Sequence, residues 1–190
     1  MSEWKETVIL MPEYVREEQD MRFSLIPDRI FSGYGAIAPE MLRTWGVRLL
    51  LSDLDFTLAA KSTQHADQAL KNWIAALRDS GIAFMIVSNN RSGKRVDAFC
   101  AELGIPYQGH AGKPSPRGLQ AARARTGAAP EETAMLGDKL LTDVLAARRA
   151  GVLSLMVEPV GGAVTVWQKV LHSLQAPFKA VCNRRIRKFP

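Results

Sequence analysis

The segment Arg48–Thr57 constrains the fold most, because it joins a run of apolar residues to two carboxylates and a hydroxyl. Three leucines precede Ser52, and Asp53, Asp55 and Thr57 follow it. A short apolar run that ends abruptly at polar residues is typical of a buried parallel strand that opens into a loop. In open α/β sheets, ligands bind at that end of the strands. The segment therefore predicts a ligand site beside a central strand.

Two carboxylates one residue apart favour phosphoryl transfer, because one Asp can attack phosphorus while the other reaches the same centre. The pattern alone is only moderately specific. Average residue usage produces an Asp-x-Asp-x-Thr about once in a few tens of chains of this length. Asp is also favoured in turns after strands. A polar strand exit without chemistry therefore stays open on this segment alone.

Short apolar runs alternate with helical patterns from residue 48 to about residue 157, and glycines close the helices. Strands are expected near residues 48–52, 83–87, 105–107, 133–136 and 152–157, and helices near residues 67–79, 92–103, 115–126 and 140–149. Strands that alternate with helices imply right-handed crossovers and a mainly parallel sheet. The predicted fold is α/β and Rossmann-like, with a five-stranded parallel sheet between helices.

The chain is long enough for one domain with terminal extensions. We expect an N-terminal extension over residues 1–21, one domain over residues 22–160, and a basic amphipathic helix and tail over residues 161–190. Pro159 and the pair Gly161-Gly162 mark the second boundary. A short helix is expected to begin at Pro39, but residues 1–47 suggest no chemistry.

The sequence carries no signal for a membrane span or for secretion. Apolar runs of about eighteen residues are absent, and the N-terminus lacks a cationic start followed by an apolar core. Cys100 and Cys182 are far apart, which fits a reducing compartment without a disulfide framework or a cysteine metal cluster. These features predict a cytoplasmic protein.

An aspartyl-phosphate mechanism needs a nucleophile, a proton donor, donors for the phosphoryl oxygens and a cation. Asp53 would attack phosphorus, and Asp55 would protonate the leaving oxygen and later activate water. Lys113 would neutralise charge on the phosphoryl group and the nucleophile. Ser88, after the second strand, would bind a phosphoryl oxygen through its hydroxyl. We expect two further substrate-binding residues, Thr57 and Asn89, the latter through its backbone N–H.

A hard cation is required, because carboxylates that converge on a dianionic substrate would otherwise repel it. Mg²⁺ is the expected cofactor, with Asp53, Asp55 and Asp138 as ligands. Asp143 would support the metal or Lys113. These residues also have possible structural roles without chemistry. Ser88 could cap a turn, and Lys113 could be a surface lysine. Asp138 and Asp143 could be carboxylates favoured at the start of a helix.

Four segments that carry these residues resemble, in their order along the chain, the four motifs of the haloacid dehalogenase (HAD) superfamily. The segments are Asp53-Leu54-Asp55-Phe56-Thr57, Val87-Ser88-Asn89, Gly112-Lys113-Pro114 and Gly137-Asp138-Lys139-Leu140-Leu141-Thr142-Asp143. The resemblance implies a Mg²⁺-dependent phosphomonoester hydrolase with an aspartyl-phosphate intermediate.

Further segments, above all Leu140-Leu141-Thr142-Asp143-Val144, are similar to the YqeG-type phosphatases of HAD subfamily IIIA. That group is related to phosphatidylglycerophosphate phosphatases, so the resemblance implies a role in phosphatidylglycerol synthesis. It covers about residues 22–160. Phe56 stands where the family usually has Asn, and Lys139 where it usually has Gln, and both border the expected site.

The motif spacing predicts a capless domain. Only 35 residues separate Asp53 from Ser88 and 25 separate Ser88 from Lys113, and the expected helices fill both intervals. An open site cannot close over a small metabolite, so it suits a phosphate carried on something large. A phospholipid, a phosphoprotein and a nucleic-acid end all meet that description.

The net charge of +6 lies entirely after Glu158, where six cations and no acid occur. Apolar residues recur there at helical spacing: Val164, Trp167, Val170, Leu171, Leu174, Phe178 and Val181. Such a helix can lie in a lipid interface, with its cations drawn to anionic head groups. Packing on the sheet and a solvated end are the open alternatives. We expect a phospholipid substrate at an anionic membrane surface, and a cytoplasmic protein with peripheral association on the inner face of the membrane.

The predicted reaction is hydrolysis of phosphatidylglycerophosphate to phosphatidylglycerol and inorganic phosphate. A protein or nucleic-acid-end phosphatase would use the same open site, although no aromatic and basic interleaving typical of a single-strand groove is present. A receiver-like phosphoacceptor without turnover also fits Asp53, Ser88 and Lys113. Asp55 argues against it, because an acid-base group beside the nucleophile favours phosphate release. The sequence predicts no oligomeric state.

Overall fold

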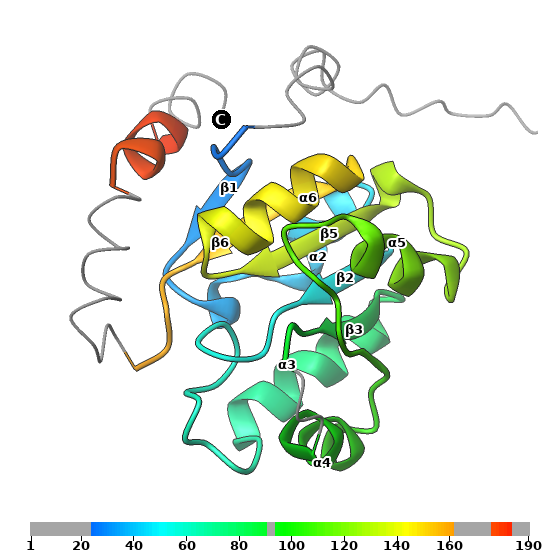
Figure 1. The fold of residues 1–190 in the computed structure, drawn as a ribbon. Coiled ribbons are helices and arrows are strands. Elements are labelled where there is room, and N and C mark those ends of the chain that lie inside the picture. The colour runs from blue at the N-terminus through cyan, green and yellow to red at the C-terminus, as the bar shows by residue number, and fades with distance from the viewer. Residues whose placement is uncertain (1–23, 91–93, 162–175, 184–190) are drawn as a thin grey trace, which may run out of the picture.

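A parallel β-sheet forms the centre of the molecule (Figure 1). The computed structural model describes residues 24–90, 94–161 and 176–183. The sheet has the strand order β1-β6-β5-β2-β3-β4, and every neighbouring pair is parallel. The strands are β1 (Arg29–Phe31), β2 (Leu49–Ser52), β3 (Ala83–Val87), β4 (Tyr107–Gln108), β5 (Thr133–Gly137) and β6 (Leu153–Val157). The α/β fold with a parallel sheet is therefore confirmed.

The described residues form six strands, one more than the sequence predicted. The additional strand is β1, which pairs with β6 at the edge of the sheet. Asp28 extends this pairing, because its carboxylate accepts a 2.7 Å hydrogen bond from the Ser154 backbone N–H. Three half-buried residues are too few to show the period-2 pattern from which a strand is predicted.

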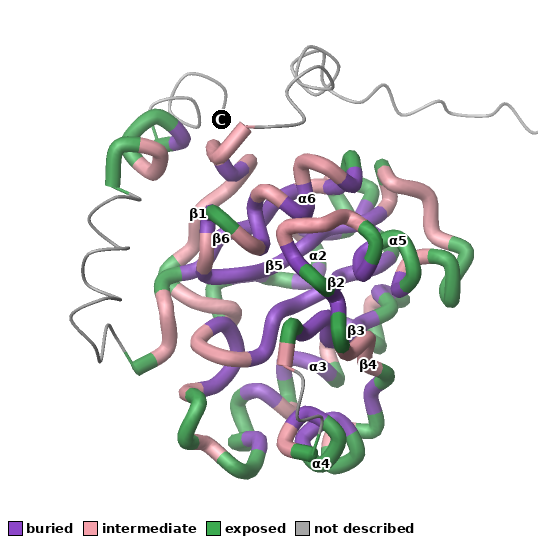
Figure 2. Tube along the Cα trace, in the orientation of Figure 1, coloured by how far each residue is buried: buried purple, intermediate pink, exposed green. Residues whose placement is uncertain are grey.

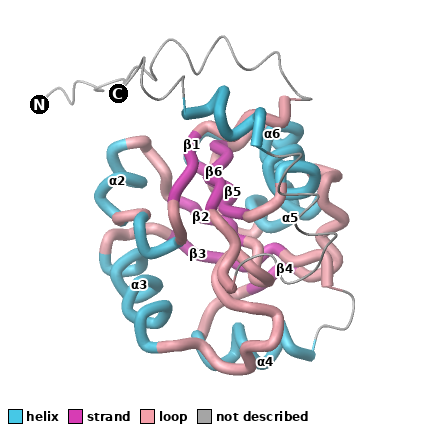
Figure 3. The backbone as a smooth tube through the Cα atoms, turned by 90° about the vertical axis from the view of Figure 1, so that its left-hand side faces the viewer, coloured by secondary structure: helices cyan, strands magenta, loops and turns pink. Residues whose placement is uncertain are grey.

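Helices cover both faces of the sheet (Figure 3). One face carries α2 (Pro39–Thr44), α3 (Gln68–Asp79) and α4 (Lys94–Leu103), and the other carries α5 (Arg117–Ala124) and α6 (Leu145–Ala150). Successive strand residues point to opposite faces, so Leu50 joins the first core, while Leu49 and Leu51 join the second. The central strand is buried from both sides, as its run of leucines requires (Figure 2).

Asp67 caps the N-terminus of α3, the helix that follows the first motif. The Asp67 carboxylate accepts a 2.8 Å hydrogen bond from the Leu70 backbone N–H, which satisfies one free donor of the first turn of α3. Trp73 and Leu77 lie on the buried face of the helix. The helix predicted near residues 92–103 is described from Lys94 onward.

The order of the strands reverses between β2 and β5. From β2 the chain runs outward through β3 to β4, then returns to β5 on the other side of β2. Ligands in open α/β sheets bind at the carboxyl ends of the two strands that flank such a reversal. Asp53 follows β2 and Asp138 follows β5, so both lie at the switch point.

Part of the predicted C-terminal helix packs on the domain. Residues 176–183 are helical, and Phe178 packs against a small core of Leu140, Val144 and Met156. Lys179 forms an ion pair of 2.8 Å with Glu158. For Phe178 and Lys179 these contacts favour the alternative of packing on the domain, since the ring is half-buried and Glu158 pairs with the ammonium. The other apolar positions of that helix up to Leu174 and the cations after Asn183 lie outside the described residues. In the described part of the chain, no helix has both the length and the apolar character needed to cross a bilayer.

Candidate active site

The sheet places three polar residues at one edge, each directly after a strand. Asp53 follows β2, Ser88 follows β3 and Asp138 follows β5. Beside them lies a pocket of about 540 Å³. Its lining residues are Asp53, Asp55, Phe56, Lys61, Ser88, Asn89, Asn90, Lys113, Lys139, Thr142 and Asp143. No cap domain stands over this pocket in the described residues, as the motif spacing predicts.

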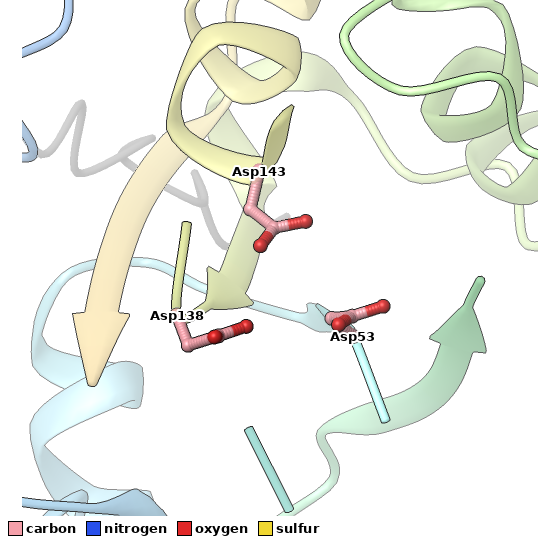
Figure 4. Close-up of side chains that lie close together, drawn as sticks. All are labelled: Asp53, Asp138 and Asp143. Carbon is pink, nitrogen blue, oxygen red and sulfur yellow. The ribbon is translucent and has the colours of Figure 1, made fainter. Parts of the chain in front are cut away.

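Three carboxylates converge at the base of the site, and we call them the acidic cluster: Asp53, Asp138 and Asp143 (Figure 4). One oxygen from each lies within 4.8 Å of the others, and all three residues are buried. Three buried negative charges in so small a space repel one another, so the cluster needs compensating positive charge.

Lys113 supplies part of that charge. Its Nζ lies 2.9 Å from Asp53 Oδ1 and 2.7 Å from Asp143 Oδ1, and its side chain is only 2% exposed. Burial works against the charged form, but Asp143 and Asp53 outweigh it and hold the pKa of Lys113 above its ordinary value. Lys113 is therefore a permanently charged bridge between two of the three carboxylates.

Asn89 fixes the backbone that carries Lys113. Its side-chain amide donates a 2.8 Å hydrogen bond to the Lys113 carbonyl, and its Oδ1 accepts one of 2.8 Å from the Lys113 N–H. The side-chain amide of Asn89 is therefore hydrogen-bonded to the Lys113 backbone through both its nitrogen and its oxygen. Substrate binding by the Asn89 backbone N–H stays a prediction.

Asp138 is held by one hydroxyl and one ammonium. Thr57 donates a 3.2 Å hydrogen bond to Asp138 Oδ1, and Lys139 Nζ lies 2.6 Å from the same oxygen. Burial raises the pKa of Asp138 to about 6, although Lys139 opposes the shift. Thr57 itself has no exposed surface. In this structure the buried hydroxyl orients the Asp138 carboxylate, and the predicted role of Thr57 in substrate binding stays a prediction.

Gly137 allows Asp143 to approach the end of β5. A methyl group at Gly137 would overlap the Asp143 side chain, so only glycine fits there. Asp143 Oδ2 accepts a 3.1 Å hydrogen bond from the Lys139 N–H. Burial raises the pKa of Asp143, and Lys113 opposes that shift.

Asp55 lines the pocket, but its carboxylate lies outside the acidic cluster. Its Oδ1 forms an ion pair with Arg95 Nη1 from α4. Arg95 also donates 3.0 Å hydrogen bonds to the carbonyls of Thr63 and Ala60. Asp55 was predicted as a metal ligand. The structure instead groups Asp143 with Asp53 and Asp138, because Arg95 engages the Asp55 carboxylate.

Phe56 and Lys139, the two departures from the family pattern, contact each other. Lys139 Nζ lies 5.5 Å from the centroid of the Phe56 ring. Phe56 has a φ of 69°, a left-handed conformation uncommon for a bulky residue. The Phe56 N–H donates to the Ala59 carbonyl at 2.8 Å, which holds this turn in place. The two departures therefore form one local unit at the rim of the site.

The acidic cluster fits a hard divalent cation. Carboxylate oxygens are the ligands that Mg²⁺ prefers, and two ammonium groups, Lys113 and Lys139, leave one of the three negative charges uncompensated. Burial raises the pKa values of Asp138 and Asp143, because it disfavours their ionised forms, so ionisation of the whole cluster needs further positive charge. A bound cation would supply it.

Sequence reasoning missed three residues that line the pocket or hold its acids. Arg95 lies on an amphipathic helix, and no local motif distinguishes it from a surface arginine. Lys61 is exposed on the turn after the first motif and lines the pocket. Asn90 donates a 3.1 Å hydrogen bond from its N–H to the Ser88 hydroxyl oxygen, which leaves the hydroxyl proton for another acceptor. The position of Asn90 directly after the second motif was the available signal.

Comparisons with known proteins agree with the motif reading. Residues 39–151 match the family model described as a hydrolase of the haloacid dehalogenase-like type. The chain is 34% identical over 138 residues to the "Probable phosphatase YqeG" of Bacillus subtilis, covering 73% of this chain and 80% of that protein. It is 29% identical over 156 residues to the chloroplastic phosphatidylglycerophosphate phosphatase 1 of Chlamydomonas reinhardtii, covering 78% of this chain and 54% of that protein.

Among solved structures, similarity is found to 3-deoxy-D-manno-octulosonate 8-phosphate phosphatase from Moraxella catarrhalis, in complex with magnesium, phosphate and the KDO molecule. The sequence identity is 18% and the TM-score 0.44, with 81% of this chain and all of that chain covered.

Proposed function

This chain belongs to the haloacid dehalogenase-like hydrolases, and we propose that it acts as a Mg²⁺-dependent phosphatase whose nucleophile is Asp53. The observation that carries the proposal is the position of Asp53. Its carboxylate lies at the switch point of the sheet, 2.9 Å from the Lys113 ammonium and within the acidic cluster, and it lines the pocket. A carboxylate in this setting can attack a phosphoryl group that the surrounding cations neutralise.

In the first half of the reaction, an Asp53 oxygen forms a bond to phosphorus. The bond between phosphorus and the leaving oxygen breaks, and that oxygen takes a proton from Asp55. Arg95 contacts Oδ1 of Asp55, so Oδ2 is the oxygen that exchanges the proton. The product alcohol then leaves, and the phosphoryl group remains on Asp53.

In the second half, a water molecule gives a proton to Asp55 and attacks phosphorus. The bond between phosphorus and the Asp53 oxygen breaks, which releases inorganic phosphate and restores both carboxyl groups. Lys113 holds Asp53 in place through both halves and neutralises charge on the phosphoryl oxygens. The Ser88 hydroxyl donates a hydrogen bond to one of these phosphoryl oxygens. Mg²⁺, held by Asp53 and Asp138 beside Asp143, would supply the positive charge that lets a dianion approach these carboxylates.

For the substrate, we propose phosphatidylglycerophosphate. The similarity to the chloroplastic phosphatidylglycerophosphate phosphatase supports this choice. The open pocket also supports it, because a lipid phosphate at a membrane surface needs no protein cap to position it. The excess of positive charge after Glu158 would favour an anionic surface.

Parallel turnover assays test the substrate. Purified protein with Mg²⁺ is given phosphatidylglycerophosphate in mixed micelles, a phosphopeptide and a 3′-phosphorylated oligonucleotide, and released phosphate is measured. We expect the lipid to have the highest kcat/KM. A higher value for the peptide or the oligonucleotide would replace the lipid assignment.

Asp53→Asn tests the mechanism with a soluble aryl phosphate. The amide keeps the shape of the side chain but cannot attack, so we expect activity to fall at least about 10³-fold with the fold retained. EDTA should stop wild-type turnover, and Mg²⁺ should restore it. Asp79→Asn, at the distant end of α3, is the matched control and should keep wild-type activity. Activity of Asp53→Asn within tenfold of wild type would exclude Asp53 as the nucleophile.

A further inference from the structure

The ammonium of Lys139 lies among the carboxylates that would hold the metal. Its Nζ is 2.6 Å from Asp138 Oδ1 and 4.0 Å from Asp53 Oδ2. Asp143, the third member of the acidic cluster, is bound by Lys113 at 2.7 Å. A divalent ion shared by Asp53 and Asp138 needs the same region of negative charge that Lys139 neutralises.

Two further contacts hold Lys139 at this place. Its backbone N–H donates a 3.1 Å hydrogen bond to Asp143 Oδ2, and the face of Phe56 attracts its ammonium at 5.5 Å from the ring centroid. The Lys139 side chain is 34% exposed, so it can move outward without disturbing the core. Lys113, at 2% exposed, has no such freedom.

We infer that Lys139 is an internal cation that competes with the divalent ion for Asp138 and Asp53. The inference rests on the proposed function, because it takes from it that the acidic cluster binds a metal. In the metal-free protein, Lys139 neutralises Asp138. When the metal binds, the ammonium has to leave Asp138 Oδ1, because two cations on one oxygen repel each other strongly. Lys139 therefore sets the concentration at which the metal binds.

Metal binding by Lys139→Gln tests the competition. The full chain is stripped with EDTA, dialysed, and titrated with MgCl₂ alone while the melting temperature is followed, since a ligand of the folded state raises it. Glutamine keeps most of the side-chain length and removes the charge. We expect the apparent Mg²⁺ dissociation constant to fall about tenfold or more. The metal-free variant should melt at a lower temperature than the metal-free wild type, because Asp138 loses its counter-charge.

Two further variants separate the charge of Lys139 from other effects. Lys61→Gln removes a lysine that lines the same pocket but has no contact with a carboxylate among the described residues, so its Mg²⁺ affinity should change less than about twofold. Lys139→Arg keeps the charge and should bind Mg²⁺ about as weakly as wild type.

The possible results distinguish the inference from the function on which it rests. If wild type responds to Mg²⁺ and Lys139→Gln has equal or weaker affinity, the competition is refuted and the metal site stands. If neither protein responds to Mg²⁺, the metal requirement in the proposed function is refuted, and the inference with it. An equal gain in Lys61→Gln would mean that any nearby positive charge has the same effect, which also refutes a specific role for Lys139.

Discussion

Arg95 and Asp55 form an ion pair that connects the first motif to the helix after β3. Besides Asp55, the guanidinium binds the carbonyls of Ala60 and Thr63, each at 3.0 Å, so one side chain fixes both the carboxylate and the turn that follows it. The pair is largely buried, with side-chain exposures of 15% for Arg95 and 20% for Asp55. Asp55 therefore has a defined orientation at the edge of the pocket.

We predict that Asp55→Asn slows the hydrolysis of alkyl phosphates far more than that of nitrophenyl phosphate in the phosphorylation step. Nitrophenolate leaves without a proton, whereas an alkoxide needs one, and proton transfer by a positioned group contributes about 10²–10⁴-fold. Single-turnover measurements with both substrates separate this step from hydrolysis of the phosphoenzyme. Equal losses for the two leaving groups would exclude Asp55 as the proton donor.

Arg95→Gln should produce a weaker form of the same defect. Without the guanidinium, Asp55 keeps its chemistry but loses its fixed orientation, so we expect kcat for an alkyl phosphate to fall about tenfold. The effect on nitrophenyl phosphate should be smaller. The neighbouring Lys94→Gln, exposed on the same helix, is the control and should behave as wild type. A uniform loss on both substrates would indicate that Arg95 only stabilises the fold.

Gly137→Ala should disrupt the acidic cluster from the backbone side. The new methyl group would overlap Asp143, which has to move away from β5 and from Lys113. We expect the unfolding free energy to fall by about 1–3 kcal/mol, in the range of overpacked sites, and kcat to fall at least about tenfold. Gly35→Ala is the control, because a methyl group there meets no neighbouring atom. Denaturant unfolding and aryl phosphate turnover measure the two effects, and wild-type turnover by Gly137→Ala would contradict the need for this close approach.

The pKa of Asp138 predicts an effect of pH on the metal-free protein. Burial raises this pKa to about 6 in the folded state, so the folded protein keeps a proton that the unfolded chain releases near pH 4. The contribution of Asp138 to the free energy of unfolding therefore falls as pH rises from about 4 to about 6, and it stays lower above that range. The asparagine of Asp138→Asn cannot ionise, so the unfolding free energy of this variant should not show that decrease.

Unfolding of EDTA-treated wild type and Asp138→Asn at pH 4.5 and pH 7.5 measures this effect. The stability of the variant relative to wild type should increase by about 1–3 kcal/mol between the two pH values. Saturating Mg²⁺ should remove the penalty in wild type at pH 7.5, because the metal stabilises the ionised carboxylate. A relative stability that does not change with pH would mean that Asp138 ionises normally.

The strand ends were predictable because burial leaves a strong local pattern. Leu49, Leu50 and Leu51 face two different cores, so all three have to be apolar, and the change to polar residues at Asp53 marks the end of the strand. The parallel sheet then brings Asp53, Ser88 and Asp138 to one edge whatever the details of the loops. The fold and the location of the site follow from these few residues.

The remaining features depend on contacts between distant segments, which no local pattern records. Arg95 reaches Asp55 across 40 residues of sequence, and Thr57 reaches Asp138 across 81. Phe56 and Lys139 were each recognised as departures from the family pattern, but their contact required the three-dimensional arrangement. The short strand β1 forms because it pairs with β6, a contact that its own three residues do not predict.

The C-terminal region combines a packed part with a cationic end, and two variants can separate them. Phe178→Ala removes a half-buried ring from the core of Leu140, Val144 and Met156, so we expect a loss of about 1–2 kcal/mol in unfolding free energy. Ending the chain after Asn183 keeps this packing and removes four cations, Arg184, Arg185, Arg187 and Lys188. The truncated protein should therefore keep its melting temperature and its aryl phosphate turnover.

The same truncation tests membrane association. Each basic residue near an anionic leaflet contributes about 1 kcal/mol, so loss of four cations should weaken binding to phosphatidylglycerol vesicles at least about 100-fold and lower turnover of lipid-embedded substrate. Wild-type binding should also weaken as salt rises from about 50 to about 500 mM, because a shorter Debye length screens the attraction. Vesicle co-sedimentation of both proteins at the two salt concentrations provides the measurement. If the truncated protein binds vesicles as wild type does, the terminal cations do not hold the enzyme on lipid, and the proposed lipid substrate would then rest on family similarity and the open pocket.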